Sequence, residues 1–246
     1  MALKSRQVAH DWARVCRLFE ASLQSAYRQT HDNFRIIVVC HETPTVTVKY
    51  DARLEFINVD FPPPARISTK LCMEDKWLKL RHSMIRAGEL KPEFVMIMDA
   101  DDLVSKHLAD FTARLHHRNG WMIRTGYRWK FGSRFIQYDS KFACGSNAIV
   151  STRLINFPKT VSDEERDNCI VLRWGHTIIG EKLAKAGTPL DQLPFPGVVY
   201  VTDHGDNDSH FGIAHSWPGW SRWAKEIPRQ RWISPRIRDE FSLDWL

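Results

Sequence analysis

The sequence lacks any apolar run of the length that crosses a membrane. A spanning helix needs about 18 or more apolar residues, whereas the longest runs here, Ile36–Cys40 and Phe94–Met98, have the length of strands. The first residues include Lys4 and Arg6 and carry no apolar core with a cleavage site, so no secretory signal is expected. We therefore expect a cytoplasmic protein without a transmembrane segment.

The sequence also lacks closely spaced cysteines. Five cysteines lie far apart along the chain: Cys16, Cys40, Cys72, Cys144 and Cys169. Such spacing supports neither a disulfide framework nor a zinc knuckle. We expect reduced and mostly buried thiols.

No long basic run is present, although 35 lysines and arginines outnumber 29 aspartates and glutamates. The net charge of +6 is dispersed along the chain, whereas a nucleic-acid surface requires basic residues gathered into a stripe. We therefore expect no nucleic-acid partner. The charge favours an anionic substrate and allows peripheral association with an anionic membrane surface.

The first half of the chain alternates helical and strand patterns. The expected elements are a helix at Val15–Tyr27, strands at Phe34–Cys40 and Leu54–Asp60, a helix at Asp75–Ala87 and a strand at Phe94–Met98. Strands that are apolar on both faces are typical of parallel sheets. The pattern predicts an α/β fold with a mostly parallel central sheet and helices on both faces.

The second half is mixed. Its expected elements are a helix at Lys106–His117, antiparallel strands within Trp121–Tyr138, a helix at His176–Ala186 and a strand at Val198–Val201. The 246 residues are enough for one sizeable domain, and no linker divides them. We expect a single domain over 1–246.

An acidic cluster, Asp99-Ala100-Asp101-Asp102, follows the Phe94–Met98 strand directly. An α/β protein binds its ligand at the carboxyl ends of its strands. Three carboxylates within four residues repel one another, and a bound Mg²⁺ or Mn²⁺ is the usual way to keep them ionised together. The alternative is that Asp102 caps a helix near Ser105 while the other two acids are solvated.

Two segments resemble the family 2-like glycosyltransferases of the GT-A fold. Leu23–Val39 looks like their first helix and second strand, and Met96–Asp102, reading MIMDADD, looks like their metal-binding Asp-x-Asp strand end. The helix before Gly187 is a third match, so the resemblance covers about Val15–Tyr200. It implies transfer of a sugar from a nucleotide-sugar donor to a carbohydrate or glycan acceptor.

The resemblance also implies residue roles. Asp99 helps to position the nucleotide ribose or the metal, and Asp101, with Asp102, ligates the Mn²⁺ or Mg²⁺ that bridges the two phosphates. Basic residues on the preceding helix face the nucleotide: Lys76, Lys79 and Arg81. Residues 1–120 are then the nucleotide-sugar half, 121–203 the acceptor and catalytic half, and 204–246 an aromatic tail. Each basic residue alone is equally compatible with a solvated helix face.

The sequence departs from the family at its start. The family begins with an apolar strand and a loop that holds the base, but only five residues precede the first helical region here. The first strand is therefore either shortened to Ala2 and Leu3 or absent from the chain. Recognition of the base by that loop is not expected to follow the family pattern.

A second departure concerns the general base. The family opens its late helix with an acidic pair, whereas Gly175 and His176 stand there in this chain. A histidine suits the abstraction of a proton from a sugar hydroxyl near neutral pH. His176 is thus the expected base of an inverting transfer, and the acids of the preceding loop are the alternatives: Asp163, Glu164 and Glu165.

The loop after the last expected strand carries four residues that could bind an ion: His204, Asp206, Asp208 and His210. A late histidine completes the metal shell in many GT-A enzymes, so His204 or His210 is the expected further ligand. The tail is rich in tryptophan: Trp217, Trp220, Trp223, Trp232 and Trp245. Such rings stack on sugars, although they more often pack in cores and interfaces.

Two other functions fit parts of the pattern. A haloacid-dehalogenase-like phosphotransferase also has a strand that ends in Asp-x-Asp, with the first Asp as nucleophile. Its signature normally lies near the chain start and has Thr or Val where this sequence has Leu103. A non-catalytic carbohydrate-binding protein is the other alternative, which the aromatic tail favours.

Overall fold

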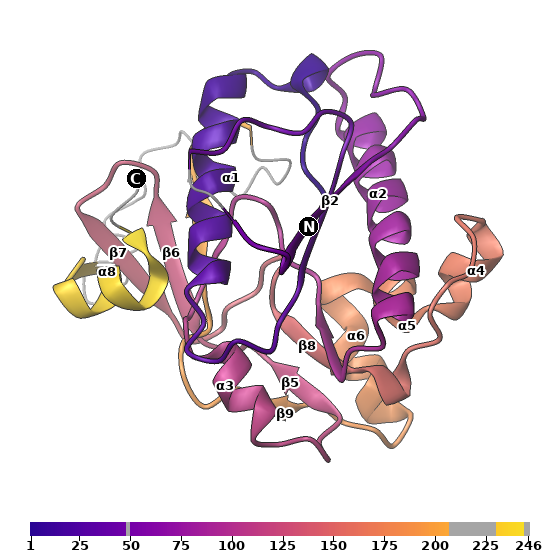
Figure 1. Ribbon diagram of the computed structural model, residues 1–246. Helices are drawn as coiled ribbons and strands as arrows, with labels where there is room; N and C mark the ends of the chain where they lie inside the picture. The colour runs from indigo at the N-terminus through magenta and orange to yellow at the C-terminus, as the bar shows by residue number, and fades with distance from the viewer. Residues whose placement is uncertain (48–49, 207–229, 244–246) are drawn as a thin grey trace, which may run out of the picture.

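The computed structural model describes residues 1–47, 50–206 and 230–243 (Figure 1). The helices are α1 (Trp12–Tyr27), α2 (Thr69–Leu90), α3 (Leu108–Ala113), α4 (Asp163–Asn168), α5 (Ile170–Arg173), α6 (Gly175–Lys185) and α8 (Pro235–Phe241), with short 3₁₀ turns at Arg6–Val8 and Thr152–Leu154. The strands are β1 (Ile36–Cys40), β2 (Leu54–Asn58), β3 (Phe94–Met96), β4 (Leu103–Val104), β5 (Gly120–Met122), β6 (Gly126–Lys130), β7 (Phe135–Asp139), β8 (Ala148–Ser151), β9 (Asp191–Gln192), β10 (Val198–Thr202) and β11 (Gln230–Trp232).

Helix α1 starts where a capping side chain satisfies its first turn. The Asp11 carboxylate accepts a hydrogen bond from the backbone N–H of Arg14 at 3.0 Å. The apolar stripe of α1 then packs against β1 in the largest core cluster. The helix predicted at Val15–Tyr27 and the strand predicted at Phe34–Cys40 are confirmed as α1 and β1. Helix α1 starts three residues before Val15.

The short first strand is present in the structure. Ala2 bridges Val39 in parallel, and the backbone N–H groups of Leu3 and Val39 donate to Val39 and Met1 at 3.0 Å each. On its other side β1 pairs in parallel with β2. Ala2 and Leu3 thus extend the β1–β2 pair by a single bridge, which is compatible with a first strand shortened to these two residues.

The sheets are mixed, which fits the predicted mostly parallel sheet only in part. The strand orders are β1-β2, β11-β7-β6-β10-β4 and β3-β8-β5-β9. Parallel pairs are β1 with β2, β10 with β6, and β5 with β9. Pairing is antiparallel for β10 with β4, β11 with β7, β3 with β8, β5 with β8, and β6 with β7. The α/β class is confirmed, and the sheet prediction is corrected.

One face of the five-stranded sheet is covered by apolar packing. Trp129, Ile136 and Val201 pack there with Ile233 and Phe241 from the segment around α8. A third core cluster joins α2, α5 and α6 to β3, β5 and β8, and Figure 1 shows α2 and α6 on the same side of the molecule. The single-domain organisation stays a prediction.

In the described ranges, no helix combines the length and the apolar character that a membrane crossing requires. Of the predicted tail, Trp217, Trp220, Trp223 and Trp245 lie outside the described residues, as do Asp208 and His210. Trp232 belongs to β11 and is 58% exposed.

Two glycines with positive φ allow a matched test of the fold. Gly120 has φ +127°, and a Cβ there would lie 2.1 Å from the backbone oxygen of Ile149, whereas Gly132 has φ +80° and open space around it. Gly120→Ala should therefore lower the free energy of unfolding by about 3 kcal/mol or more, from backbone strain and overpacking together. Gly132→Ala should cost about 1–2 kcal/mol, from strain alone. Urea unfolding of both variants measures the difference, and equal losses would contradict the pairing of β5 with β8.

Candidate functional site

The acidic cluster lies in the turn between β3 and β4. The backbone N–H of Asp99 donates to Ser146 Oγ at 2.9 Å, and that of Asp102 donates to the Asp99 carbonyl at 3.4 Å. Ser146 belongs to the segment just before β8, the strand that pairs with β3. The turn is thus tied to the neighbouring strand, and its three carboxylates leave it in different directions.

Asp99 faces α2 and the segment before β8. Its Oδ1 accepts from Lys76 Nζ at 2.6 Å, and a Cβ on Gly145 would lie 2.0 Å from its Oδ2. A side chain at 145 would therefore displace this carboxylate from its position. The structure therefore brings Lys76 to the acidic cluster with Asp99 as its partner, while its role toward a nucleotide stays a prediction.

Asp101 meets the predicted late histidine. His204 Nε2 and Asp101 Oδ2 are 3.0 Å apart, although the two residues are 103 positions apart in the chain. The Asp206 backbone N–H donates to His204 Nδ1 at 3.4 Å, which orients the ring so that Nε2 faces Asp101. Burial acts to raise the pKa of Asp101, but the hydrogen bond and the charge of His204 hold it below its usual value.

His204 is fixed by contacts with the start of α1. It is buried, and its carbonyl accepts from Arg14 Nη1 at 2.8 Å. Nearby, the Asp206 carboxylate accepts from the backbone N–H groups of His10 and Asp11 at 2.8 and 3.3 Å. Asp206 also lies 3.5 Å from Lys4 Nζ. Asp206 thus holds the loop after β10 against the N-terminal segment.

Asp102 is predicted to be a metal ligand, but the structure places it away from the cavity. Its side chain is fully buried, and its Oδ2 accepts from Ser146 Oγ at 2.6 Å. Its Oδ1 has no hydrogen-bond partner among the described residues. Burial, with the charges of Asp101 and Asp99 adding to it, raises the pKa of Asp102 well above its usual value. Burial therefore favours the neutral form of Asp102, which is not among the residues of the cavity wall.

His176 lies where the sequence predicts it, in the first turn of α6. The preceding Gly175 has φ +53°, and a Cβ there would lie 3.4 Å from the Trp77 ring. Burial lowers the pKa of His176 below its usual value, and the nearby Asp99 charge opposes this only in part. The imidazole is thus neutral at pH 7 and able to accept a proton.

These side chains converge on one cavity of about 490 Å³, a size typical of small-molecule sites. Its wall includes Lys76, Asp99, Asp101, His176 and His204. They come from α2, from the turn after β3, from α6 and from the loop after β10. Five of the predicted site residues therefore lie around one cavity, whereas Asp102, Lys79 and Arg81 are not among its wall residues.

Arg81 lies elsewhere. Its guanidinium donates to the Val161 carbonyl at 2.6 Å and to the Asp163 carboxylate at 2.7 Å. It therefore fastens α2 to the segment around α4, and it is not among the residues of the cavity wall. Asp163, one of the alternative candidate bases, therefore forms an ion pair with Arg81.

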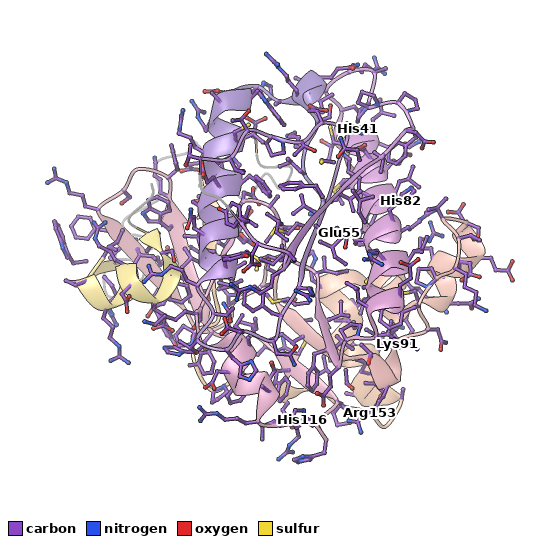
Figure 2. The ribbon with its side chains drawn as sticks, in the orientation of Figure 1. His41, Glu55, His82, Lys91, His116 and Arg153 are labelled. Carbon is purple, nitrogen blue, oxygen red and sulfur yellow. The ribbon has the colours of Figure 1, made fainter. Side chains whose placement is uncertain are left out.

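Lys79 is also held inside the protein rather than facing a nucleotide. Its ammonium donates to the Leu3 carbonyl at 2.8 Å and to Asp75 Oδ2 at 2.7 Å. Asp75 Oδ1 lies 2.6 Å from His41 Nε2, and Figure 2 shows His41 next to α2. Burial lowers the pKa of Lys79, and Asp75 opposes this effect. This buried network joins β1, α2 and the N-terminal segment beside the cavity.

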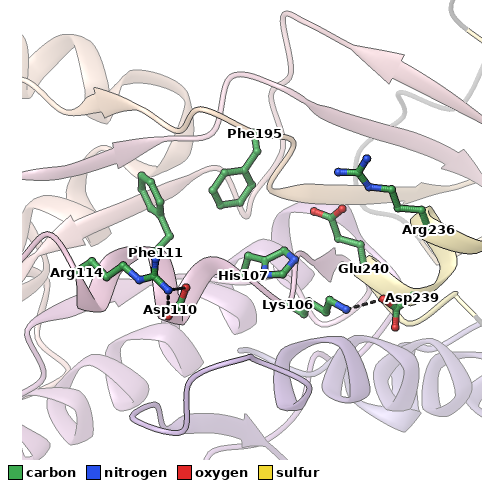
Figure 3. Close-up of a pocket in the computed structure, with 9 residues that line it drawn as sticks. All are labelled: Lys106, His107, Asp110, Phe111, Arg114, Phe195, Arg236, Asp239 and Glu240. Carbon is green, nitrogen blue, oxygen red and sulfur yellow. Dashed lines mark hydrogen bonds and ion pairs between the residues drawn. The ribbon is translucent and has the colours of Figure 1, made fainter.

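A second cavity of about 360 Å³ lies between α3 and α8. Figure 3 shows two of its charged pairs, Lys106 with Asp239 and Arg114 with Asp110. The rings of Phe111 and Phe195 also line it and meet edge to face, with their centroids 5.4 Å apart. None of the predicted site residues lines this cavity.

Several residues of the main cavity were not predicted from the sequence. Gly145, Asp75, Arg128 and Tyr200 belong to the cavity wall. Ser146 is not among the wall residues, but its hydroxyl accepts from the backbone N–H of Asp99. A small-residue pair directly before a buried strand indicates a close backbone approach, and it could have drawn attention to Gly145 and Ser146. Arg128 and Tyr200 carry no such signal, because only strand pairing brings them to the cavity.

The neutral state of Asp102 has a measurable consequence for stability. In the unfolded chain, Asp102 loses its proton near its usual pKa of 3.8. In the folded protein the pKa is raised, so Asp102 loses the proton only at a higher pH. Its contribution to the free energy of unfolding therefore falls as the pH rises, by about 1.4 kcal/mol per pH unit until the raised pKa is reached. Asp102→Asn removes this loss, so the variant should gain stability relative to the wild type between pH 4 and pH 8.

Chemical unfolding in EDTA across this pH range measures the effect. Asp102→Ala serves as the control, because it also lacks the titrating carboxyl but leaves the Ser146 hydroxyl without its partner, so it should be less stable than Asp102→Asn at every pH. A constant difference between Asp102→Asn and the wild type at all pH values would show that Asp102 is not protonated in the folded state.

A comparison with protein-family models finds no match for this sequence. A comparison with curated proteins finds none either. The function of the chain is therefore inferred from the residues of the cavity and from their geometry.

Proposed function

We propose that this protein is a metal-dependent glycosyltransferase of the GT-A type. It transfers a sugar from a nucleotide-sugar donor to an acceptor hydroxyl, with inversion at the anomeric carbon. The observation that carries the proposal is the contact of Asp101 with His204 at 3.0 Å inside the main cavity. It joins the end of the acidic cluster to the late histidine, the two positions at which the resembling enzymes hold their metal.

The residues present fit a divalent cation. Within the described ranges, no group of three or more His, Cys, Asp or Glu side chains is arranged as a complete metal site. Magnesium is commonly held by one or two protein carboxylates together with substrate phosphates, and manganese accepts oxygen and imidazole ligands. Asp101 and His204 would hold the cation, with Asp99 beside them. When bound, it would neutralise the charge of the departing diphosphate.

Lys76 and Gly145 position Asp99. Lys76 neutralises this carboxylate at 2.6 Å, and Gly145 leaves the space that the carboxylate occupies. With its charge balanced and its position fixed, Asp99 is suited to accept hydrogen bonds from the donor ribose or from water around the cation. Lys76 thus supports donor binding by holding Asp99.

His176 is the proton acceptor of the proposed transfer. It lines the main cavity and also a small, mainly apolar pocket of about 60 Å³ beside Trp77. A neutral imidazole between a charged cavity and an apolar pocket can take the proton from an acceptor hydroxyl as that oxygen attacks the donor sugar. The proton moves to an imidazole nitrogen, and the diphosphate leaves.

The metal assignment predicts the behaviour of Asp101→Asn. The variant loses a charged ligand, so its affinity for nucleotide-sugars in Mn²⁺ should fall by roughly tenfold or more, while its fold is kept. Thermal shifts with UDP-, GDP- and dTDP-sugars, with Mn²⁺ or with EDTA, measure this effect. Asp110→Asn, a change to a partly exposed acid of α3, is the matched control. Full donor affinity of the wild type in EDTA would contradict the metal site.

The assignment of the base predicts a different pattern for His176→Ala. Turnover, measured as release of nucleoside diphosphate, should fall by roughly a hundredfold, with donor affinity nearly unchanged. Because burial lowers the pKa of His176 below its usual 6.5, the wild-type rate should decline only below that pH. His116→Ala, in an exposed histidine, is the control. An equal loss of donor affinity, or a product that keeps the donor's anomeric configuration, would overturn the assignment.

A further inference from the structure

A row of polar side chains crosses the five-stranded sheet from the main cavity to the edge of the sheet. Strand pairing places Tyr200 opposite Arg128, Arg128 opposite Gln137, and Gln137 opposite Gln230. Residues that are directly paired across strands point to the same face of a sheet. The four side chains therefore form one continuous row over β10, β6, β7 and β11.

The row begins inside the candidate site. Tyr200 and Arg128 both line the main cavity, and the Arg128 guanidinium lies 5.7 Å from the Tyr200 ring. With strands about 4.8 Å apart, the three steps from β10 to β11 span roughly 14 Å. Exposure grows along this path, since Tyr200 is 9% exposed and Trp232 on β11 is 58% exposed.

An aromatic pair lies at the outer end of the row. Phe135 and Trp232 are directly paired on β7 and β11, with ring centroids 5.3 Å apart at 88°. Each stands two residues from a glutamine of the row, so both rings share its face. Apolar packing covers the opposite face of the sheet, whereas these two rings are about half exposed.

The charges of this face are balanced. Arg128 pairs with Asp139 at 2.8 Å, and Lys130 lies 3.5 Å from Asp203. Paired charges and amides hydrogen-bond to hydroxyl groups without a net field, whereas anionic lipid headgroups require an excess of positive charge. Exposed rings beside such groups suit the apolar faces and the hydroxyls of sugars.

We propose that this row and the Phe135–Trp232 pair, together called the acceptor track, bind an extended oligosaccharide whose end enters the main cavity. The proposal rests on the proposed function, because the bound chain is the acceptor of the transfer. It specifies the acceptor class: a chain of several sugar units, rather than a single sugar or a small alcohol. The aromatic pair binds units that lie beyond the reacting end.

The test is direct binding to an array of bacterial, fungal and plant oligosaccharides of increasing length. The wild type should bind a set of the longer glycans, and Trp232→Ala and Phe135→Ala should each weaken that binding by roughly tenfold. Binding of monosaccharides and disaccharides should not change. Ile67→Ala, at an apolar side chain that is 54% exposed away from the track, should bind like the wild type. Both aromatic residues are exposed, so the variants should keep the wild-type melting temperature.

Two results would overturn the acceptor track: a wild type that binds no glycan of the array, or aromatic variants that bind as well as the wild type. Salt-sensitive binding to phosphatidylcholine–phosphatidylserine vesicles that depends on Trp232, without glycan binding, would instead identify a membrane surface and also overturn it. Nucleotide-sugar thermal shifts separate the two proposals. Their absence in the wild type would defeat the transferase function, while glycan binding that depends on Trp232 would still support the track.

Discussion

Electrostatic repulsion among three carboxylates within four residues is the constraint on which this site depends. The structure relieves it in three different ways. Burial raises the pKa of Asp102 well above its usual value, Asp99 pairs with Lys76, and Asp101 accepts a hydrogen bond from His204. Two ionised carboxylates can then stand next to each other at the cavity. When a ligand brings a cation to the site, the repulsion between the carboxylates of Asp99 and Asp101 is already balanced by Lys76 and His204.

The basic residues of α2 show how far the sequence could predict the site. Successive residues of a helix are about 100° apart, so Lys76 and Arg81 differ by about 140° and cannot face the same ligand. Helix geometry alone is therefore enough to separate these two residues. The burial of Lys79 could not have been foreseen, because its partners, the Leu3 carbonyl and Asp75, meet only when the short first strand lies against α2.

The helices and buried strands were predictable because apolar periodicity is a local property of the chain. The order of the strands was not, because β10 lies between β6 and β4, and β8 between β3 and β5, through contacts that no short segment encodes. The same limit applies to Asp101 and Asp102. Both follow one strand, and only the turn decides that Asp101 reaches the cavity while Asp102 points to Ser146.

The contacts of Asp206 have a consequence for how the chain folds. Its carboxylate binds the backbone of His10, 196 positions away, and the neighbouring His204 meets Asp101 across 103 positions. Contacts between such distant positions require the closure of very long loops, and they form slowly compared with local helices and hairpins. We therefore expect the cavity to be completed late in folding, after the helices and the β6–β7 hairpin. Ligand binding in this protein reports on the finished fold, because partly folded chains do not yet contain the site.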